Sequence, residues 1–326
     1  MAAELHARAI AACADQGARL VGFASRSAEA ALAREYDTQC MEPAELMERT
    51  DIDVVCICSP SGMHARQALQ AMHSGKHVLV EKPMALSVAE ARNMVTTSAT
   101  TGRLLGVAFQ RRSEPLFQRV WQAVDSGALG SLVGGLVSIP YKRDMDYYNS
   151  AAWRGTWALD GGGALMNQGI HLLDLLLWWM GDPKHIQARA ATLRHDIEVE
   201  DTLCATLAFQ GGAMATLLAT TATEPGFAHR VELYGTLGGI QIEGEQVLRW
   251  QTAYRDGPPA MRNKAETAGA GGDPRGIPIT GHIGLIINFM AALRGGEPLL
   301  ADGRQGLRSL AIIEAIYAAA GLNTNL

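Results

Sequence analysis

The 326-residue sequence lacks several features that mark out whole classes of protein. Lys and Arg number only 28 and the net charge is −5, so the sequence offers no basic face for nucleic acid or for an anionic membrane. No run of 18 apolar residues occurs, and the N-terminus has no long apolar core like that of a signal peptide. We therefore expect a soluble cytoplasmic protein with no nucleic-acid partner and no membrane partner.

Cysteine is scarce as well, and its five residues show no metal-ligand pattern. Cys56 and Cys58 lie together in the strand-like stretch DVVCIC, but no His or Cys partner accompanies them at the spacing of a zinc site. We expect reduced, buried thiols, as in the cytoplasm, and no metal centre.

The chain also lacks the glycine pattern of a dinucleotide-binding loop, because no Gly-x-Gly-x-x-Gly occurs anywhere. Strands nevertheless alternate with helices of about 10 to 15 residues over 1–112, which is typical of a doubly wound parallel sheet. These residues are predicted to form a Rossmann-like domain. The expected helices cover 2–16, 27–36, 63–75 and 87–102, and the expected strands cover 18–25, 53–58, 77–81 and 103–109.

Beyond a helix at 114–127 the pattern changes to consecutive strands, several joined by short turns that contain glycine. Residues 113–326 are predicted to form an α/β domain with a large, mostly antiparallel open sheet, whose C-terminal helix packs back on the first domain. A helix at 162–181 interrupts the strands, and helices at 281–294 and 303–320 close the chain. The expected strands are 131–142, 185–195, 201–210, 213–223, 229–236, 238–244 and 246–250.

Charged residues stand where a buried strand of the first domain ends. In HVLVEKP the apolar run is followed by Glu81 and Lys82 and stopped by Pro83, and in CSPSGMH the neighbouring strand gives way to a Ser-Pro-Ser turn. Ligands of open α/β sheets bind in the crevice at the carboxyl ends of the strands, so both segments are candidate binding loops. A solvated charge pair and a capped turn are the ordinary alternatives.

The helix that interrupts the second domain carries a polar stripe. Asn167, His171 and Asp174 are spaced i, i+4 and i+7, which puts them on one face of an α-helix. The other faces are apolar, so the stripe is predicted to be buried against partners or a cavity, and a satisfied core histidine is the alternative. A lysine at the mouth of a nucleotide-binding sheet and this histidine can together take a proton from an alcohol while a nicotinamide takes the hydride.

Three segments together resemble the Gfo/Idh/MocA oxidoreductases, the family of glucose–fructose oxidoreductase and inositol dehydrogenase. EKPMALSVAEAR resembles the family's Glu-Lys-Pro motif, GGGALMNQGIHLLDLLLWWMG its signature helix, and SPSGMHARQAL the loop that contacts the nicotinamide ribose. The resemblance covers nearly the whole chain. It implies an NAD- or NADP-dependent dehydrogenase that reversibly oxidises a hydroxyl of a sugar, cyclitol or related molecule.

The resemblance also implies roles for individual residues. Lys82 is the proton-relay residue, His171 is its partner or the substrate-facing base, and Asn167 holds substrate or the nicotinamide carboxamide, so these three are the predicted catalytic residues. The predicted cofactor-binding residues are Ser25, Arg26, Ser59, Pro60, Ser61, His64, Glu81, Lys82 and Gln110. The predicted substrate-binding residues are Lys82, Arg143, Tyr148, Trp153, Arg154, Asn167 and His171.

Two departures from the family pattern concern the cofactor. The family begins with a strand and a Gly-rich loop, whereas this sequence opens at MAAELHARAI, which corresponds to the helix after them. We expect that the natural protein starts upstream of Met1 and that the chain as written binds cofactor poorly. Ser25 and Arg26 stand where an acidic residue would hold the ribose 2′-hydroxyl. A hydroxyl and a guanidinium suit a 2′-phosphate, which favours NADP over NAD, and a solvated arginine is the alternative.

The stretch YKRDMDYYNSAAWRGTWALDGGG bears on the substrate because it is rich in Arg, Tyr and Trp. Aromatic rings stack on sugar or base faces, and Arg143 or Arg154 can pair with a carboxylate or phosphate, although packing alone is the alternative role for Trp153 and Trp157. The stretch is similar to the corresponding region of relatives that oxidise UDP-N-acetylglucosaminuronate. An acidic or nucleotide-linked sugar therefore ranks first, a free sugar or inositol second, and an aromatic cis-dihydrodiol third. A relative that binds a sugar or dinucleotide without turning it over is the competing function.

The open sheet of the second domain also predicts self-association. Its long strands leave one face without helices to cover it, and an exposed apolar sheet face is normally buried against a partner. We expect a homodimer or a homotetramer built from dimers.

Overall fold

In the computed structural model, which describes residues 2–24, 30–253, 257 and 278–322, the chain forms two units. The first comprises Met1–Ser113 and Ile279–Leu307, and the second comprises Glu114–Pro278 and Arg308–Leu326. Parallel strands occur in the first unit, and one large, mostly antiparallel sheet occupies the second. The predicted α/β fold class is therefore confirmed.

The central strands of the first unit are short apolar runs. Strands β3 (Val54–Ile57), β4 (His77–Val80) and β5 (Leu105–Val107) pair in parallel, in that order. The last three residues of β4 are buried, as expected for the middle strand of a parallel sheet. A separate parallel pair is formed by β1 (Gly22–Ala24) and β2 (Gln39–Met41).

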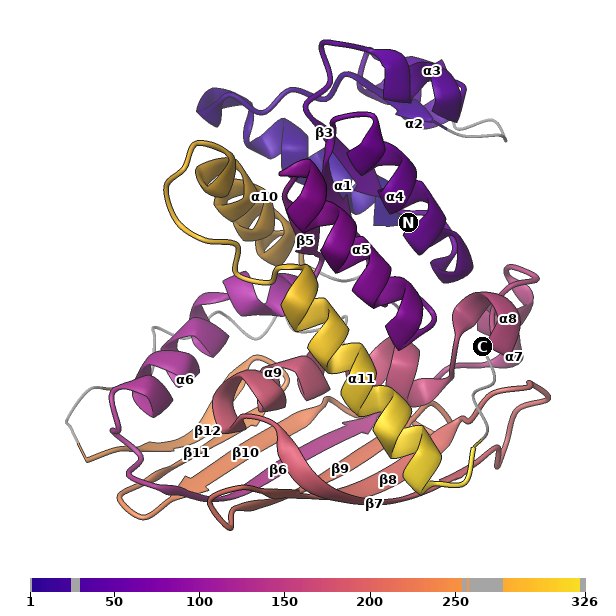
Figure 1. Cartoon of the computed structure of the whole chain (residues 1–326). Helices are drawn as coiled ribbons and strands as arrows, with labels where there is room; N and C mark the ends of the chain where they lie inside the picture. Colours follow the sequence, from indigo (N-terminus) through magenta and orange to yellow (C-terminus); the bar gives the residue numbers. More distant parts are fainter. Residues whose placement is uncertain (1, 25–29, 254–256, 258–277, 323–326) are drawn as a thin grey trace. The chain divides into compact units, whose positions relative to one another are not determined.

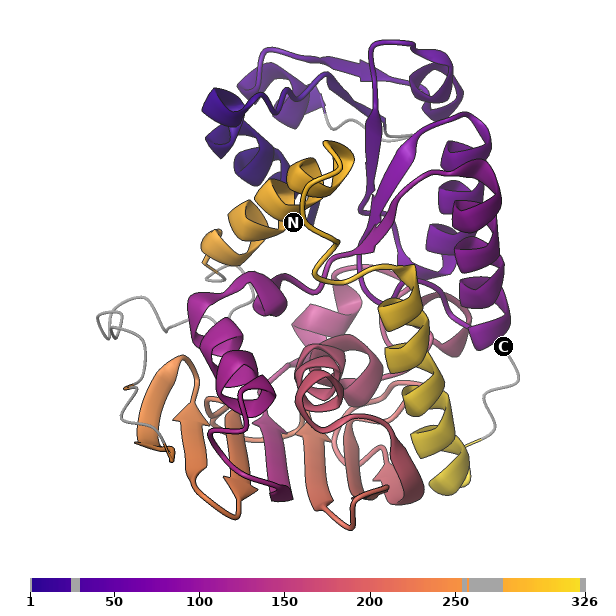
Figure 2. The ribbon, with the colours of Figure 1, turned by 60° about the vertical axis from the view of Figure 1, so that its left-hand side comes forward.

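Helices lie on both faces of the three-stranded sheet, so the unit is doubly wound (Figure 2). One face is covered by α4 (His64–His73) and α5 (Val88–Thr101), and the other by α1 (Ala2–Ala12) and α10 (Thr280–Leu293). The hydroxyl of Ser87 accepts the N–H of Glu90 at 3.2 Å and so caps the start of α5. The other helical segments are α2 (Ala30–Glu35), α3 (Pro43–Glu48) and the 3₁₀ turns η1 (Ala14–Gln16), η2 (Ser61–Met63) and η3 (Gln110–Ser113).

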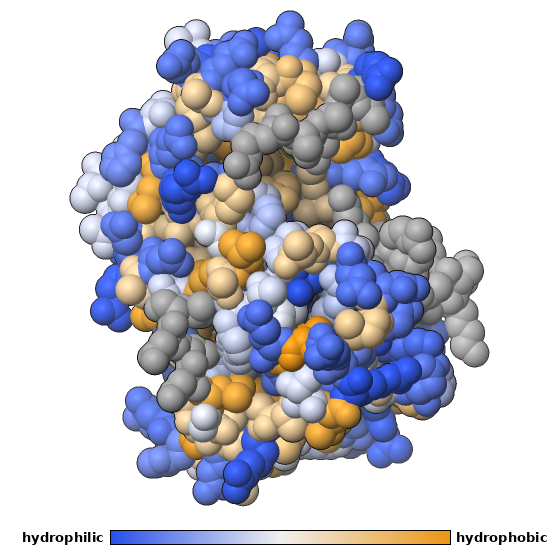
Figure 3. Space-filling view, turned by 90° about the vertical axis from the view of Figure 1, so that its right-hand side faces the viewer, coloured by the Kyte–Doolittle hydropathy of each residue, from blue (hydrophilic) through white to orange (hydrophobic). Residues whose placement is uncertain are grey.

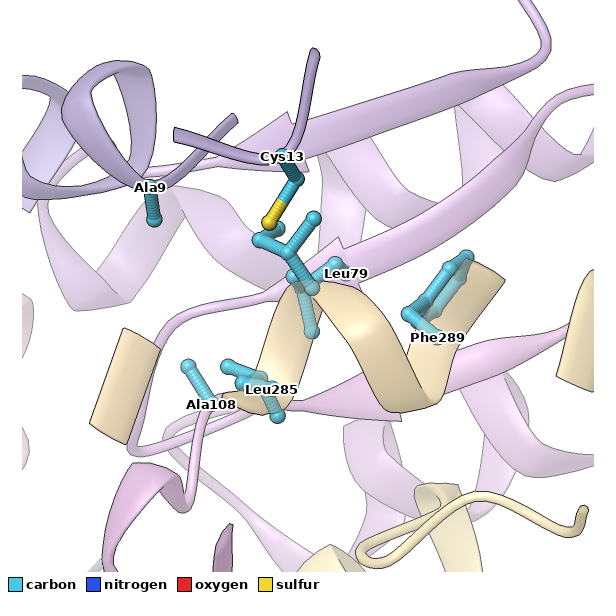
Figure 4. Packing of buried hydrophobic residues seen from close by; sticks show 7 residues of the cluster. Ala9, Cys13, Leu79, Ala108, Leu285 and Phe289 are labelled. Atoms are coloured by element: carbon cyan, nitrogen blue, oxygen red, sulfur yellow. The ribbon is translucent and has the colours of Figure 1, made fainter. Parts of the chain in front are cut away.

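A hydrophobic cluster joins α1 and α10 to strand β4 (Figure 4). Its buried members are Ala9, Cys13, Leu79, Ala108, Leu285, Ile286 and Phe289. A Cβ added at Gly106 of β5 would lie 2.9 Å from the Phe289 ring, so the close approach of α10 to β5 requires glycine there. The cluster fixes three segments that are far apart in the sequence.

The second unit is built on a seven-stranded sheet in the order β12-β11-β10-β6-β9-β8-β7. Neighbouring strands are antiparallel except for β6 and β9, which pair in parallel. Buried and exposed residues alternate along β8 and β9, which is typical of a sheet with one buried face. The strands are β6 (Leu132–Pro140), β7 (Pro183–Ala191), β8 (Thr202–Phe209), β9 (Met214–Thr220), β10 (Arg230–Gly235), β11 (Gly239–Glu243) and β12 (Gln246–Gln251).

The two faces of this sheet differ. Helices α6 (Pro115–Asp125) and α9 (Ile170–Met180) lie on one face (Figure 1). The opposite face exposes Met214, Leu218 and Tyr234 together with Thr206 and Thr216, so it mixes apolar and polar side chains. Hydrophobic and hydrophilic residues are also interspersed on the side of the molecule seen in Figure 3. Across 2–24, 30–253 and 278–322, none of the helices is both long and apolar enough to span a membrane.

Candidate active site

Two loops at the carboxyl ends of β3 and β4 are held together by His64. The imidazole is buried, with Nδ1 2.7 Å from the carbonyl oxygen of Pro83 and Nε2 2.8 Å from that of Ser59. Burial lowers the pKa of His64 below its usual value. The side chain predicted to contact cofactor therefore ties the Ser-Pro-Ser loop to the Glu-Lys-Pro loop, and Lys82 lies half-buried in the second of these.

Glu81 pairs with a histidine that the sequence did not single out. Its Oε1 atom accepts a hydrogen bond from Nε2 of His6 at 2.9 Å, and its Oε2 atom accepts the backbone N–H of Lys82 at 3.2 Å. Burial alone would lower the pKa of His6, but the neighbouring side chains of Cys56 and Glu81 outweigh it and raise that pKa to about 10. Burial would raise the pKa of Glu81, but His6 holds it well below its usual range. The pair thus favours a buried imidazolium at His6 and a part-buried carboxylate at Glu81.

The other predicted cofactor residues lie in the same unit. The hydroxyl of Ser59 donates to Oε1 of Gln67 at 2.7 Å, and Pro60 precedes the turn η2, in which Ser61 is buried. Gln110 is buried in η3, where its carbonyl oxygen accepts the hydroxyl of Ser113 at 2.7 Å. The structure therefore places Ser59, Pro60 and Ser61 at the end of β3, next to His64. Ser25 and Arg26 lie outside the described residues.

In the second unit, the segment expected to be one α-helix begins as a π-helical turn, η4 (Ala164–Gly169), and continues as α9. Asn167 lies in the turn, and its Nδ2 atom donates to Oδ1 of Asp160 at 2.9 Å. Asp160 is buried, and its Oδ2 atom accepts the N–H of Gly155 at 3.0 Å. The carboxylate therefore fixes the orientation of the Asn167 amide. Wide helical turns of this kind are frequent at functional sites.

Glu200 accounts for the unusual start of this helix. Its Oε2 atom accepts the N–H of Gly163 at 2.8 Å, and its Oε1 atom accepts the N–H of Leu165 at 2.9 Å and the hydroxyl of Tyr317 at 2.9 Å. Its carbonyl oxygen accepts the N–H of Ala164 at 2.9 Å. Burial raises the pKa of Glu200 to about 7, although these donors favour the charged form. One residue thus satisfies three successive amides at the beginning of η4.

The other two residues of the predicted polar stripe lie on α9. His171 is half-buried, and Asp174 is buried and accepts the hydroxyl of Ser309 at 2.9 Å. Ser309 belongs to α11 (Gly303–Ala319). Two residues of the stripe, Asn167 and Asp174, therefore have hydrogen-bonding partners within the protein. The sequence predicted either such partners or a cavity beside the stripe.

Two arginines gather around one tyrosine ring. The Cζ atoms of Arg143 and Arg154 lie 5.3 Å and 4.4 Å from the centre of the Tyr147 ring, on α7 (Met145–Asn149), and Arg154 also lies 4.6 Å from the Trp153 ring. The hydroxyl of Tyr147 accepts hydrogen bonds from Arg154 at 2.7 Å and from Nε2 of Gln168 at 3.3 Å. Because Gln168 belongs to η4, this arginine cluster is linked to the turn that holds Asn167.

Buried contacts fix the position of Arg143. Its backbone N–H donates to the carbonyl oxygen of Thr221 at 2.9 Å, and its own carbonyl oxygen lies 2.9 Å from Nε2 of His195. The hydroxyl of Tyr148 lies 2.9 Å from that of Thr221, and burial raises the pKa of Tyr148 to about 12. Tyr148 is therefore engaged with the second unit's own core, whereas Trp153 and Arg154 are only half-buried.

No sequence motif contains His6, Glu200 or Tyr317. Each acts on a segment that is distant in the chain, since His6 and Glu81 are 75 residues apart and Glu200 and Tyr317 are 117 apart. No local pattern marks such partners. The one local signal is the place of Glu81 directly after the buried strand β4.

Two family descriptions match the chain. Residues 1–109 match the oxidoreductase family with an NAD-binding Rossmann fold, and residues 117–241 match the GFO/IDH/MocA C-terminal domain. These matches confirm the resemblance carried by the three sequence motifs. The first match also confirms that the chain contains an NAD-binding Rossmann domain.

Similarity to individual proteins extends over both units. The crystal structure of the WlbA dehydrogenase from Bordetella pertussis in complex with NADH and UDP-GlcNAcA has a TM-score of 0.86 and 30% identity, covering 98% of this chain and 94% of that one. Inositol 2-dehydrogenase of Rhizobium meliloti (strain 1021) is 27% identical over an alignment of 330 positions, which covers 96% of this chain and 92% of that protein. The uncharacterized oxidoreductase YrbE of Bacillus subtilis (strain 168) is 29% identical over 219 residues, and the match spans 61% of its length.

Proposed function

Because the chain belongs to the Gfo/Idh/MocA family of NAD-binding oxidoreductases, we propose that it transfers a hydride between a nicotinamide cofactor and a hydroxyl or keto carbon of an acidic or nucleotide-linked sugar. The observation that carries the substrate class is the pair of guanidinium groups around Tyr147, joined through Gln168 to the turn that holds Asn167. Guanidinium groups recognise carboxylate and phosphate through paired hydrogen bonds.

The proposed chemistry divides between cofactor and protein. A bound nicotinamide accepts or supplies the hydride. Lys82 and His171 take up the proton that leaves the substrate hydroxyl and return it in the reverse direction. Asn167 holds the substrate or the carboxamide, and Asp160 is a positioning residue because it fixes the Asn167 side chain. Glu81 supports the cofactor from the end of β4.

Replacing the relay lysine tests the reaction. Lys82→Met is expected to lower kcat by about 10² or more with nearly unchanged cofactor affinity, because a general acid–base group contributes about 10² to 10⁴. Lys184→Met, at an exposed position of β7, is the matched control and should retain activity. A double-mutant cycle with His171→Ala tests whether the two side chains act in one step, since groups that act as a unit give non-additive losses. Near wild-type turnover of Lys82→Met would end the assignment.

A substrate panel tests the acidic-sugar assignment. Sugar acids, UDP-linked sugar acids, free sugars and inositols are compared by absorbance change at the reduced nicotinamide band. Arg154→Gln should lower kcat/KM for an acidic substrate by about 10- to 100-fold, as expected for loss of a charged hydrogen bond, and should affect a neutral polyol little. Arg189→Gln, exposed on β7, is the control.

A free polyol is the second candidate substrate, and the match to inositol 2-dehydrogenase favours it. Faster turnover of inositol than of any acidic sugar, with Arg154→Gln unchanged, would establish that reading. Cofactor binding without turnover of any compound in the panel would instead support the non-catalytic relative.

The choice between NAD and NADP remains a prediction from Ser25 and Arg26. We propose that Arg26 contacts a 2′-phosphate, so the ratio of kcat/KM for NADP to that for NAD should fall in Arg26→Ala. The known complex with NADH belongs to the WlbA relative. An unchanged ratio in the variant would contradict the proposed contact.

We also propose that the chain pairs with a second copy through the sheet face that exposes Met214, Leu218 and Tyr234. Sedimentation of the wild type should give a dimer or tetramer. Leu218→Arg should shift it toward monomer, and a wild-type monomer at micromolar concentration would refute the interface.

A further inference from the structure

Three metal-ligating side chains from distant segments meet in the first unit. His6 of α1, Glu81 at the end of β4 and His282 of α10 place one ligand atom each within 4.8 Å of one another. His6 and His282 are 2% and 3% exposed, and their rings meet edge to face with centroids 5.4 Å apart. Two imidazoles and a carboxylate form a donor set that suits Zn²⁺ and related divalent cations.

The two imidazoles differ from two other buried histidines of the first and second units, His64 and His195. His64 and His195 have a hydrogen-bonding partner at both ring nitrogens. In contrast, the Nδ1 atoms of His6 and His282 are buried with no hydrogen-bond partner. A buried polar atom without a partner is costly, so such atoms need an explanation, and an unseen ion is one of the recognised ones.

The packing around the group holds its members in place. Ala9 follows His6 by one helical turn on α1, and Cys13 comes directly after the end of that helix. Leu285 and Phe289 follow His282 by one and two turns on α10. All four side chains belong to the hydrophobic cluster that also contains Leu79 of β4 (Figure 4). The three ligands therefore stand at one end of a shared core that already fixes the elements carrying them.

We propose that His6, Glu81 and His282 bind one divalent cation of the Zn²⁺ type, which joins α1, the end of β4 and α10. Ligand atoms at about 2.0 to 2.1 Å from zinc in a tetrahedral site lie about 3.3 to 3.5 Å apart. The three ligand atoms lie within 4.8 Å of one another, so each pair needs to approach by at most about 1.5 Å. Each imidazole offers the cation one ring nitrogen, Glu81 offers one carboxylate oxygen, and solvent completes the coordination. Glu81 is also the residue proposed to support the cofactor, so the tests measure metal binding and stability and not turnover.

Calorimetric titration of the chelator-treated full chain with ZnCl₂ tests the site. One Zn²⁺ per chain is expected, with a Kd of micromolar or below. Free Zn²⁺ at about 100-fold over Kd should then raise Tm by about 5 to 10 °C, because it binds only the folded state. His282→Gln should weaken binding at least about 100-fold and abolish the rise in Tm. His185→Gln, an exposed histidine on β7, is the matched control and should bind like the wild type.

The wild-type chain loaded with Co²⁺ gives a readout that does not depend on any variant folding. The intense visible absorption of four-coordinate Co²⁺ is expected, at one equivalent per chain and displaced by Zn²⁺. Equal Zn²⁺ affinity in the wild type and a correctly folded His282→Gln would overturn the proposal. So would the weak spectrum of six-coordinate Co²⁺ or the absence of binding to the wild type.

Discussion

Replacing Gly163 with alanine should separate the two segments that shape the start of η4. A Cβ at this position would lie 1.7 Å from the carbonyl oxygen of Glu200 and 2.7 Å from its carbonyl carbon. Ordinary van der Waals contacts of a Cβ begin at 3.4 Å, so the backbones must move apart by about 1.7 Å. Both neighbours are main-chain atoms, which cannot rotate away as the end of a side chain can.

The cost follows from the hydrogen bonds that cross this contact. Glu200 accepts the N–H groups of Gly163, Ala164 and Leu165 at 2.8 to 2.9 Å, and a separation of that size breaks all three. A buried polar group left without its partner costs about 1 to 3 kcal/mol. The free energy of unfolding should therefore fall by at least about 3 kcal/mol, a large part of the ~5 to 15 kcal/mol that a domain possesses.

Urea unfolding followed by tryptophan fluorescence measures this loss in the right place, because all six tryptophans lie in the second unit. Gly211→Ala is the matched control, since the glycine is exposed and a Cβ there meets nothing within 4 Å. The control should change the free energy of unfolding by no more than about 0.5 kcal/mol. A Gly163→Ala variant within 1 kcal/mol of wild type would refute the reasoning from close approach.

Two neighbouring carboxylates should show opposite pH dependence. Burial raises the pKa of Glu200 from 4.5 to about 7, so the folded state binds the proton more tightly and stability falls as pH rises through that window. Between pH 4.5 and 8, the wild type should lose about 3 kcal/mol of unfolding free energy relative to Glu200→Gln. Parallel pH profiles of the two proteins would contradict this. Asp201 has a lowered pKa because burial is outweighed by N–H donors from Leu193, Arg194 and His195. Its contribution is therefore complete above its usual 3.8 and lost as pH falls through the folded pKa. Asp201→Asn should cost about 3 to 5 kcal/mol at pH 7, with the difference from wild type narrowing only in acid; a constant difference down to pH 2 would count against it.

Strands β4 and β8 could be predicted because their pattern of burial follows the local order of apolar and polar residues. The run HVLV became β4 with its last three residues buried, and the alternating pattern of DTLCATLAF became β8. Strand β2 has two exposed residues out of three and no apolar run, so nothing in Gln39–Met41 distinguished it from a loop. Burial on two faces produces a sequence signal, whereas a short strand at the margin of a sheet does not.

In the helix predicted at 162–181, the spacing of polar residues did not predict the backbone conformation of the first turn. A spacing of i, i+4 and i+7 predicts one face only if the backbone keeps about 3.6 residues per turn. Glu200 accepts the amides at the start of the segment, and Ala164–Gly169 winds as a wider π-helical turn. The residue responsible lies 37 positions from Gly163 and cannot be identified from the segment itself.

Substitution of Lys82, which a sequence motif contains, should affect turnover. Substitution of Glu200 or Tyr317, which only the structure brings together, should affect stability. Lys82 is half-buried at a strand end, where ligands of parallel sheets bind, so its loss should reduce turnover and leave the fold nearly intact. Glu200 and Tyr317 are buried and hydrogen-bonded to each other, so removing either leaves the other's polar group without a partner. Their variants should lose stability first, and any loss of activity should follow the fraction of folded chain. An active-site motif can thus be local in sequence while the framework that orients it is assembled from across the chain.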